Sequence, residues 1–228
     1  MNITFTNISG DTSLEQVQPA SKFIPDWYKN IESYVGGVKK PNDDASGNSG
    51  TVKRCMPVFD AINAGYIITS PADVYVSIVD GKQHFKWAAF NLISFHPIEQ
   101  ALEHPLKNGY HYPKWQNPWA IRTPKGYSTM FVQPMHRESV FTILPGIVDT
   151  DEYYASVNFP FVINNPEFEG LIPKGTPIAQ VIPFKRDSWT VQFGAEKEYK
   201  EHLKIIDKLQ TRFFDRYKTM FRQDKEYK

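Results

Sequence analysis

The sequence contains only one cysteine, Cys55, among its 228 residues. An intrachain disulfide and a cysteine-rich metal site are therefore both excluded. A lone cysteine packs in a protein interior more often than it reacts, so we expect Cys55 to be a buried thiol. The fold must consequently depend on its apolar core, which a chain of this length is large enough to form.

Long apolar segments are missing as well. No apolar run approaches the ~18 residues that a membrane-spanning helix needs. The N-terminal segment MNITFTNISGDTS has neither the basic start nor the apolar centre of a signal peptide. We therefore expect a cytoplasmic protein that is neither secreted nor bound to a membrane.

The chain has almost no net charge, since 26 basic and 25 acidic residues leave +1. Such a balance provides no long-range field to attract nucleic acid, so we expect no specific nucleic-acid binding. Walker loops, dinucleotide fingerprints and serine elbows do not occur in the sequence. The histidines and Glu99 lack the spacing of a zinc or iron site, so no metal site is expected. The residues considered for such a site were His96, Glu99, His104, His111 and His136.

Aromatic residues and prolines are abundant, and together they favour short strands joined by rigid turns. The clearest signal is Asp80-Gly81, which separates two strand-like runs and predicts a tight hairpin over 73–89. Pro25 predicts the start of a helix, and the aromatic segment 110–119 is expected to be an ordered loop. Further strands are predicted at 3–5, 128–132, 140–144, 156–163 and 177–183.

These elements predict a mainly β domain over residues 1–194, with short strands in a barrel or sandwich. The polar segment 36–50 is expected to be a flexible loop within it. From residue 195 to 228 there is no proline or glycine, and apolar residues recur every three or four positions, which predicts one long amphipathic helix. Its apolar stripe packs either on its own domain or on another subunit. The stripe consists of Tyr199, Leu203, Ile206, Phe213, Tyr217 and Met220.

Three stretches resemble, in the same order, motifs of the dUTPase and dCTP deaminase superfamily. The first is Asn63-Ala-Gly-Tyr66, and the second runs from Pro124-Lys-Gly-Tyr127 to Pro134. The third joins Gly146-Ile-Val-Asp149-Thr-Asp-Glu-Tyr153 to Gly175-Thr-Pro-Ile-Ala-Gln180. The dUTPase-like region therefore covers residues 53–184.

The resemblance implies a β-clip, which is a distorted barrel of short strands, and a site for a small nucleotide-like ligand. Asp149 would be the catalytic residue and would accept hydrogen bonds from a sugar hydroxyl and an attacking water. Tyr153 would lie flat against a deoxyribose. An equally good interpretation of Asp149 is a turn carboxylate that caps its own backbone. The other ligand-binding residues that the resemblance implies are Gly65, Tyr66, His136, Arg137, Asp151 and Gln180.

The sequence also departs from that superfamily at several motif positions. dUTPases carry an acidic residue after the Gly-Tyr of the first motif, where this chain has Ile67, and Arg-Ser after the proline of the second, where it has Met135 and His136. Their glycine-rich C-terminal arm is replaced by the predicted helix. Because a triphosphate needs several donors and cations, we expect ligand binding without dUTP hydrolysis. No cofactor is expected, and Mg²⁺ would accompany only a bound nucleotide.

Two alternatives stay open: a nucleotide hydrolase or deaminase with a rearranged site, and a viral structural or host-interaction protein. The second follows from another resemblance, because Phe23-Ile-Pro-Asp-Trp-Tyr28, residues 55–60 and residues 182–189 are similar to segments of marine tailed-phage proteins. That resemblance implies a viral origin and the host cytoplasm as location. Since dUTPase-type β-clips usually form trimers, a homo-oligomer, and in particular a trimer, is expected.

Overall fold

The computed structural model describes residues 1–37, 50–88, 91–100, 104–105, 112–210 and 217–228. The chain divides into two compact units, which we call the β unit and the helical unit. The β unit comprises residues 1–23, 64–186 and 227–228, and the helical unit comprises residues 24–63 and 187–226. This division does not coincide with the predicted boundary at residue 194, because residues 24–63 group with the C-terminal segment.

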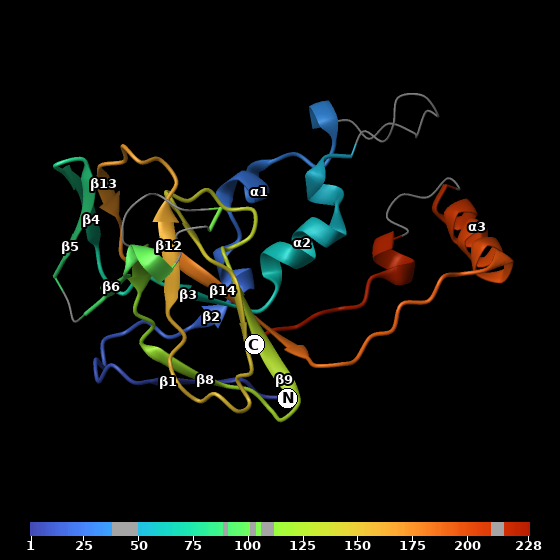
Figure 1. Cartoon of the computed structure of the whole chain (residues 1–228). Coiled ribbons are helices and arrows are strands. Elements are labelled where there is room, and N and C mark those ends of the chain that lie inside the picture. Colours follow the sequence, from blue (N-terminus) through green and yellow to red (C-terminus); the bar gives the residue numbers. More distant parts are fainter. Residues whose placement is uncertain (38–49, 89–90, 101–103, 106–111, 211–216) are drawn as a thin grey trace. The chain divides into compact units, whose positions relative to one another are not determined.

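The β unit contains all the strands that the structure describes, and they form four antiparallel sheets (Figure 1). The strand orders are β1-β8, β10-β12-β7-β6, β11-β9-β14-β3-β2 and β13-β4-β5. The mainly β prediction is confirmed, but the described strands do not close into a barrel. The strands are β1 Thr4–Asn7, β2 Gln18–Pro19, β3 Tyr66–Thr69, β4 Val74–Val79, β5 Lys82–Trp87, β6 Ile93–His96, β7 Tyr112–Trp115, β8 Trp119–Arg122, β9 Tyr127–Val132, β10 Phe141–Ile143, β11 Gly146–Val148, β12 Phe159–Ile163, β13 Gly170–Ile172 and β14 Pro177–Lys185.

The predicted hairpin is present as β4 and β5. Its turn residues Asp80 and Gly81 have φ values of 51° and 71°. A two-residue turn of this kind needs φ > 0 at both positions so that its twist matches that of the strands. The pairing therefore runs in register from Val79↔Lys82 to Val74↔Trp87.

The prediction of a loop at 110–119 is wrong for Tyr112–Trp115, which forms β7, and for Trp119, which begins β8, whereas residues 116–118 connect the two strands without regular structure. This strand pairs with β6 along its full length, although it contains Pro113. On its other side, β12 pairs only with Lys114 and Trp115. Pro113, which has no N–H to donate, thus lies beyond the reach of the second ladder, where a proline is tolerated in a strand. Trp115 and Trp119 of this segment are buried, so its aromatic side chains belong to the core.

The core of the β unit lies between the two larger sheets and includes side chains of the β13-β4-β5 sheet. Its centre is aromatic: the Trp115 ring stacks on Phe161 with centroids 5.0 Å apart, and Phe141 contacts both rings. Phe131 and Phe159 pack against each other beside them. Large aromatic side chains contribute most of the buried apolar area here, so they fix how the sheets face each other.

The helical unit contains α1, which begins after Pro25 as predicted, and the C-terminal α3. The C-terminal helix prediction is confirmed for residues 196–210 and wrong for residues 222–228, which are not helical. Phe213 of the predicted stripe and most of the predicted loop 36–50 lie outside the described residues. The helices are η1 Ala20–Phe23 and η4 Ile98–Gln100 in the β unit, and α1 Asp26–Asn30, η2 Val35–Gly37, η3 Val52–Arg54, α2 Met56–Asn63, α3 Glu196–Gln210 and η5 Tyr217–Phe221 in the helical unit.

Two ion pairs attach the non-helical C-terminal segment to α2 within the helical unit. Arg222 donates to both carboxylate oxygens of Asp60, and Lys225 Nζ donates to Asp60 Oδ2 over 3.0 Å. The guanidinium also lies 5.8 Å from the centroid of the Phe59 ring. Asp60 therefore holds Arg222 and Lys225 of this segment against α2.

The prediction that Cys55 is buried is wrong, because its side chain is exposed. Cys55 lies at the start of α2, where its carbonyl oxygen accepts the N–H groups of Val58 and Phe59. Residues at a helix start lie at the surface more often than those of its apolar face. None of the helices in the described part of the chain has the length and apolar character needed to cross a membrane.

Candidate functional site

Asp149 lies directly after β11, at the point where three neighbouring strands of the five-stranded sheet end. β9 lies between β11 and β14, and its first residues pair with the last residues of both. This register brings Asp149, Ser128 and Arg186 together although they are far apart in the sequence. We call the group formed by Asp149, Asp151, Ser128 and Arg186 the carboxylate cluster.

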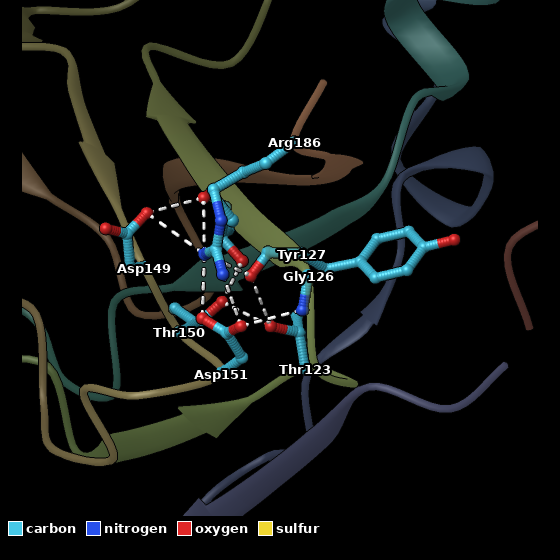
Figure 2. Close-up of polar contacts among 9 residues, drawn as sticks. Thr123, Gly126, Tyr127, Asp149, Thr150, Asp151 and Arg186 are labelled. Carbon is cyan, nitrogen blue, oxygen red and sulfur yellow. Dashed lines mark hydrogen bonds and ion pairs between the residues drawn. The ribbon is translucent and has the colours of Figure 1, made fainter. Parts of the chain in front are cut away.

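The Arg186 guanidinium is the centre of the carboxylate cluster, and Figure 2 shows its contacts with both aspartates. Its Nη1 donates to Oδ1 of Asp151 over 2.7 Å and to Oδ1 of Asp149 over 3.2 Å. Nη2 donates to the second oxygen of Asp151. Ser128 Oγ accepts from Nη1 over 3.1 Å and donates to Asp149 Oδ1 over 2.6 Å. The arrangement is a bidentate arginine–carboxylate pair with a second carboxylate attached at one oxygen.

Asp151 is the buried member of this pair, and its side chain is 2% exposed. Besides Arg186, it accepts the backbone N–H of Gly126 over 2.8 Å. The hydrogen bonds from Arg186, followed by that from Gly126, lower the pKa of Asp151 to about 2. Both of its oxygens are therefore engaged within the protein, and Asp151 positions Arg186.

Three threonine hydroxyls support the carboxylate cluster from inside the sheet. Thr150 Oγ1 lies 2.8 Å from the hydroxyl oxygens of both Thr123 and Thr129. All three residues are buried. Because buried hydroxyl groups are costly when unpaired, this chain of hydrogen bonds fixes residue 150 and the two aspartates on either side of it.

The Asp149 carboxylate is the exposed member of the cluster, since its side chain is 63% exposed. Ser128 and Arg186 occupy its Oδ1, and no described residue donates to Oδ2. The turn after β11 is closed by the Asp149 carbonyl oxygen, which accepts the N–H groups of Glu152 and Tyr153. The described contacts thus show no capping by the carboxylate itself, and Oδ2 can accept a hydrogen bond from a ligand hydroxyl. Tyr153, predicted to contact the same ligand, has a half-exposed ring.

Gln180 lies in β14 and connects two of the predicted motifs. Its Oε1 accepts the N–H of Met135 over 2.9 Å, and its Nε2 donates to the carbonyl oxygen of Ala64 over 2.6 Å. The side chain is fully buried. Its amide therefore joins the loop after β9 to the turn before β3, which is a structural role.

Gly65 and Tyr66 lie beside this connection. Gly65 has φ +70°, and a Cβ atom there would lie 1.9 Å from the Val181 carbonyl oxygen. The close approach of the two backbones explains why this position is glycine. The Tyr66 ring packs edge-on against Phe5 and Tyr227, and burial raises the pKa of its hydroxyl.

The second notable charged group is the guanidinium of Arg137. The residue lies in the loop between β9 and β10, next to His136, which has a left-handed backbone with φ 56°. The Arg137 Nε and Nη2 atoms are buried, and neither has a hydrogen-bond partner among the residues that the structure describes. Burial lowers the pKa of the guanidinium to about 10. A buried cation without a partner is costly, so this group is suited to hold an anion.

The predicted site residues thus form two separate groups. Asp149, Asp151 and Tyr153 follow β11 beside the start of β9, whereas His136 and Arg137 follow the end of β9, beside Gln180. The six residues of β9 extend over roughly 17 Å at ~3.4 Å per residue. The length of β9 therefore keeps the two groups of one chain too far apart to contact the same small ligand.

No metal centre accompanies either group. The described residues contain no cluster of three or more His, Cys, Asp or Glu side chains that could hold a metal ion. His96 contacts Gln100 through its Nδ1, and the His104 ring packs edge-on against Tyr112. His111 lies outside the described residues. Arg186 already binds both oxygens of Asp151 and Oδ1 of Asp149, so the described contacts leave a single carboxylate oxygen of the cluster for a cation such as Mg²⁺.

Sequence reasoning did not assign Arg186 and Ser128 to the site. Arg186 binds the carboxylates of Asp151 and Asp149, which lie 35 and 37 positions earlier in the chain. A pattern of neighbouring residues does not predict a contact over such a separation. A basic residue directly after a long strand was the only signal. No protein-family model matches the chain, and neither does any curated protein.

Proposed function

We propose that this chain is a binding protein for a small phosphate-bearing, nucleotide-like ligand, without dUTP hydrolysis. The observation that carries the proposal is Arg137, whose buried Nε and Nη2 atoms have no hydrogen-bond partner in the described part of the chain. A phosphate offers oxygens in the geometry that a guanidinium fork binds best. Binding would supply the missing hydrogen bonds and so offset the cost of keeping the cation partly buried.

The state of Asp149 supports binding over hydrolysis. A hydrolytic carboxylate must hold a water and a sugar hydroxyl, but one oxygen of Asp149 is already occupied by Ser128 and Arg186. Only Oδ2 is open to a ligand. One free acceptor suits recognition of a hydroxyl and leaves no described second group to activate a water.

The β-clip and the relation to the dUTPase superfamily belong to the same proposal. Gly65 and Gly175, the motif glycines, have φ values of 70° and 83° and precede β3 and β14. β14 pairs with both β3 and β9, so the motif strands are neighbours in one sheet. These features support the proposed relation through the backbone, which requires glycine at both turns.

We also propose a homo-oligomer, with the trimer as its preferred form. The separation of Asp149 from Arg137 supports it, because a second copy can bring one group to the other. Exposed apolar side chains on α3, including Tyr199 and Leu203, are further support. Large exposed apolar patches are typical of protein contact surfaces.

A thermal-shift titration with dUTP, dCTP, dUMP and inorganic pyrophosphate tests the ligand. A ligand at 100 times its Kd should add about 2.7 kcal/mol to the stability of the folded chain. Deoxyuridine, which lacks phosphate, is the matched control and should produce no shift. Equal shifts by deoxyuridine and dUMP would contradict phosphate recognition.

The two alternatives predict different outcomes in the same preparation. A hydrolase or deaminase with a rearranged site would release pyrophosphate, phosphate or ammonia from the nucleotide that shifts the melting temperature, and Asp149→Asn would abolish the release. A structural or host-interaction protein would show no shift with any ligand of the panel. Either result would replace the binding proposal.

A further inference from the structure

The chain carries a short apolar segment that has the pattern of a strand but pairs with none of the described strands. Trp189, Val191 and Phe193 are 91%, 80% and 95% exposed. Polar residues alternate with them, and the segment has no regular secondary structure. Alternation of β-branched and aromatic residues with polar ones is typical of a strand that buries one face. We call residues 188–193 the arm.

The five-stranded sheet has an apolar row on the face that the core does not use. Ile147, Met130 and Ile182 are direct neighbours across β11, β9 and β14. Ile147 is 62% exposed, and the other two are partly buried. The opposite face carries Phe131 and Val181, which belong to the buried core. The row therefore lies on the outer face of the sheet.

β11 is the edge strand beside this row. Among the described strands it pairs only with β9, and a Cβ atom at Gly146 would meet no other atom within 4 Å. An extended segment can add to such an edge through backbone hydrogen bonds and place alternate side chains on one face. The arm has the matching pattern, with three apolar residues at every second position.

We infer that the arm of one copy adds to the β11 edge of a second copy and covers the row of Ile147, Met130 and Ile182. The whole arm cannot pair with the β11 edge of its own chain, because Trp189 at its start does not reach that edge. A strand beside β11 lies three strand spacings from β14, about 14 Å. The three residues from Arg186 to Trp189 extend over at most about 10 Å, and Arg186 is held in the carboxylate cluster.

The area supports a second copy as the occupant. An aromatic side chain buries about 150–250 Å², so Trp189 and Phe193 together contribute at least about 300 Å² from one arm. With Val191 and the apolar surface of the acceptor added, one contact between arm and acceptor buries several hundred square ångströms in total. A stable interface needs about 1,200–2,000 Å² in total, which reciprocal or cyclic exchange of arms approaches. Because arm and acceptor are different surfaces, the exchange closes either reciprocally between two copies or as a ring of more copies.

Light scattering after gel filtration tests the inference. The natural chain has a mass of 26.3 kDa, and we expect a particle of at least two chains at micromolar concentration. Trp189→Asp with Phe193→Asp on the arm, and separately Ile147→Asp on the acceptor, should each yield monomers with an unchanged circular dichroism spectrum. Ile8→Asp, an exposed apolar position directly after β1, is the matched control and should leave the mass unchanged.

Mixing the two defective variants makes the test specific. The arm variant keeps its acceptor and the acceptor variant keeps its arm, so the mixture should form a two-chain species. In a Cys55→Ser background, Ile147→Cys with Val191→Cys should form a disulfide between chains on oxidation. A monomeric natural chain, an arm variant of unchanged mass, or a disulfide within one chain would each overturn the inference.

Discussion

Replacing Gly65 with alanine is expected to destabilise the β unit through two separable effects. The first is backbone strain, because φ is +70° at this position and a side chain in the left-handed region costs about 1–2 kcal/mol. The second is a collision, because the new Cβ would lie 1.9 Å from the Val181 carbonyl oxygen. A normal contact needs about 3.5 Å, so the two backbones would have to move apart.

The collision is costly because the opposing atom belongs to a central strand. Val181 is fully buried and pairs with both Tyr66 and Phe131. Overpacking of this kind costs about 1–3 kcal/mol. The total loss should therefore be about 2–5 kcal/mol, a large part of the 5–15 kcal/mol that stabilises an ordinary domain.

Urea unfolding followed by tryptophan fluorescence measures this loss. Gly175→Ala is the matched control, because Gly175 has φ +83° and no atom lies within 4 Å of its Cβ position. It should show the strain alone, about 1–2 kcal/mol. Equal losses for the two variants would refute the close approach of Gly65 to β14.

Three further predictions concern charged side chains. The folded-state pKa of Asp151 is lowered to about 2, so its ionised form stabilises the fold above about pH 4. This stabilisation should decrease as the pH drops toward 2. Urea unfolding compared from pH 2.5 to 6 should show a smaller pH dependence of stability in Asp151→Asn. Arg137→Met should leave the ligand-free chain as stable as the natural chain or about 1 kcal/mol more stable, because an unpaired, partly buried cation is removed. Isothermal titration should show that this variant no longer binds the phosphate ligand. A clear loss of stability would instead indicate that Arg137 has a structural partner. Asp60→Asn should speed tryptic cleavage after Arg222 and Lys225, because both side chains lose their ion pair with residue 60. Asp224→Asn removes only the exposed end of the same network, so trypsin should cleave this variant at the rate of the natural chain.

Local signals in the sequence predicted much of the secondary structure. The Asp80-Gly81 hairpin, the helix after Pro25, the strands around 128–132 and 177–183 and the start of the C-terminal helix all agree with the structure. Each depends on a turn residue, a missing N–H or an alternation within a few residues. Residues 112–115 were mispredicted because the prolines of the segment argue against a strand. Pro113 fits in β7 because β12 pairs only with the two residues after it.

The candidate site depended far less on local pattern. The sequence identified Asp149 and Arg137 as residues of interest, but not that they lie at opposite ends of β9. It also did not reveal that Arg186 holds both aspartates, or that the Gln180 amide is used within the fold.

The sequence by itself determined the β-rich character, the glycine turns and the helix at 196–210, because propensities and turn requirements act between near neighbours. Only the tertiary structure decided which carboxylate is buried, which cation lacks a partner and which face of the five-stranded sheet serves the core. Those outcomes depend on strand order and register, which bring Arg186 to Asp151 and Gly65 to Val181. Contacts of that kind join residues tens of positions apart, so the free energy that selects them comes from the packed sheet as a whole.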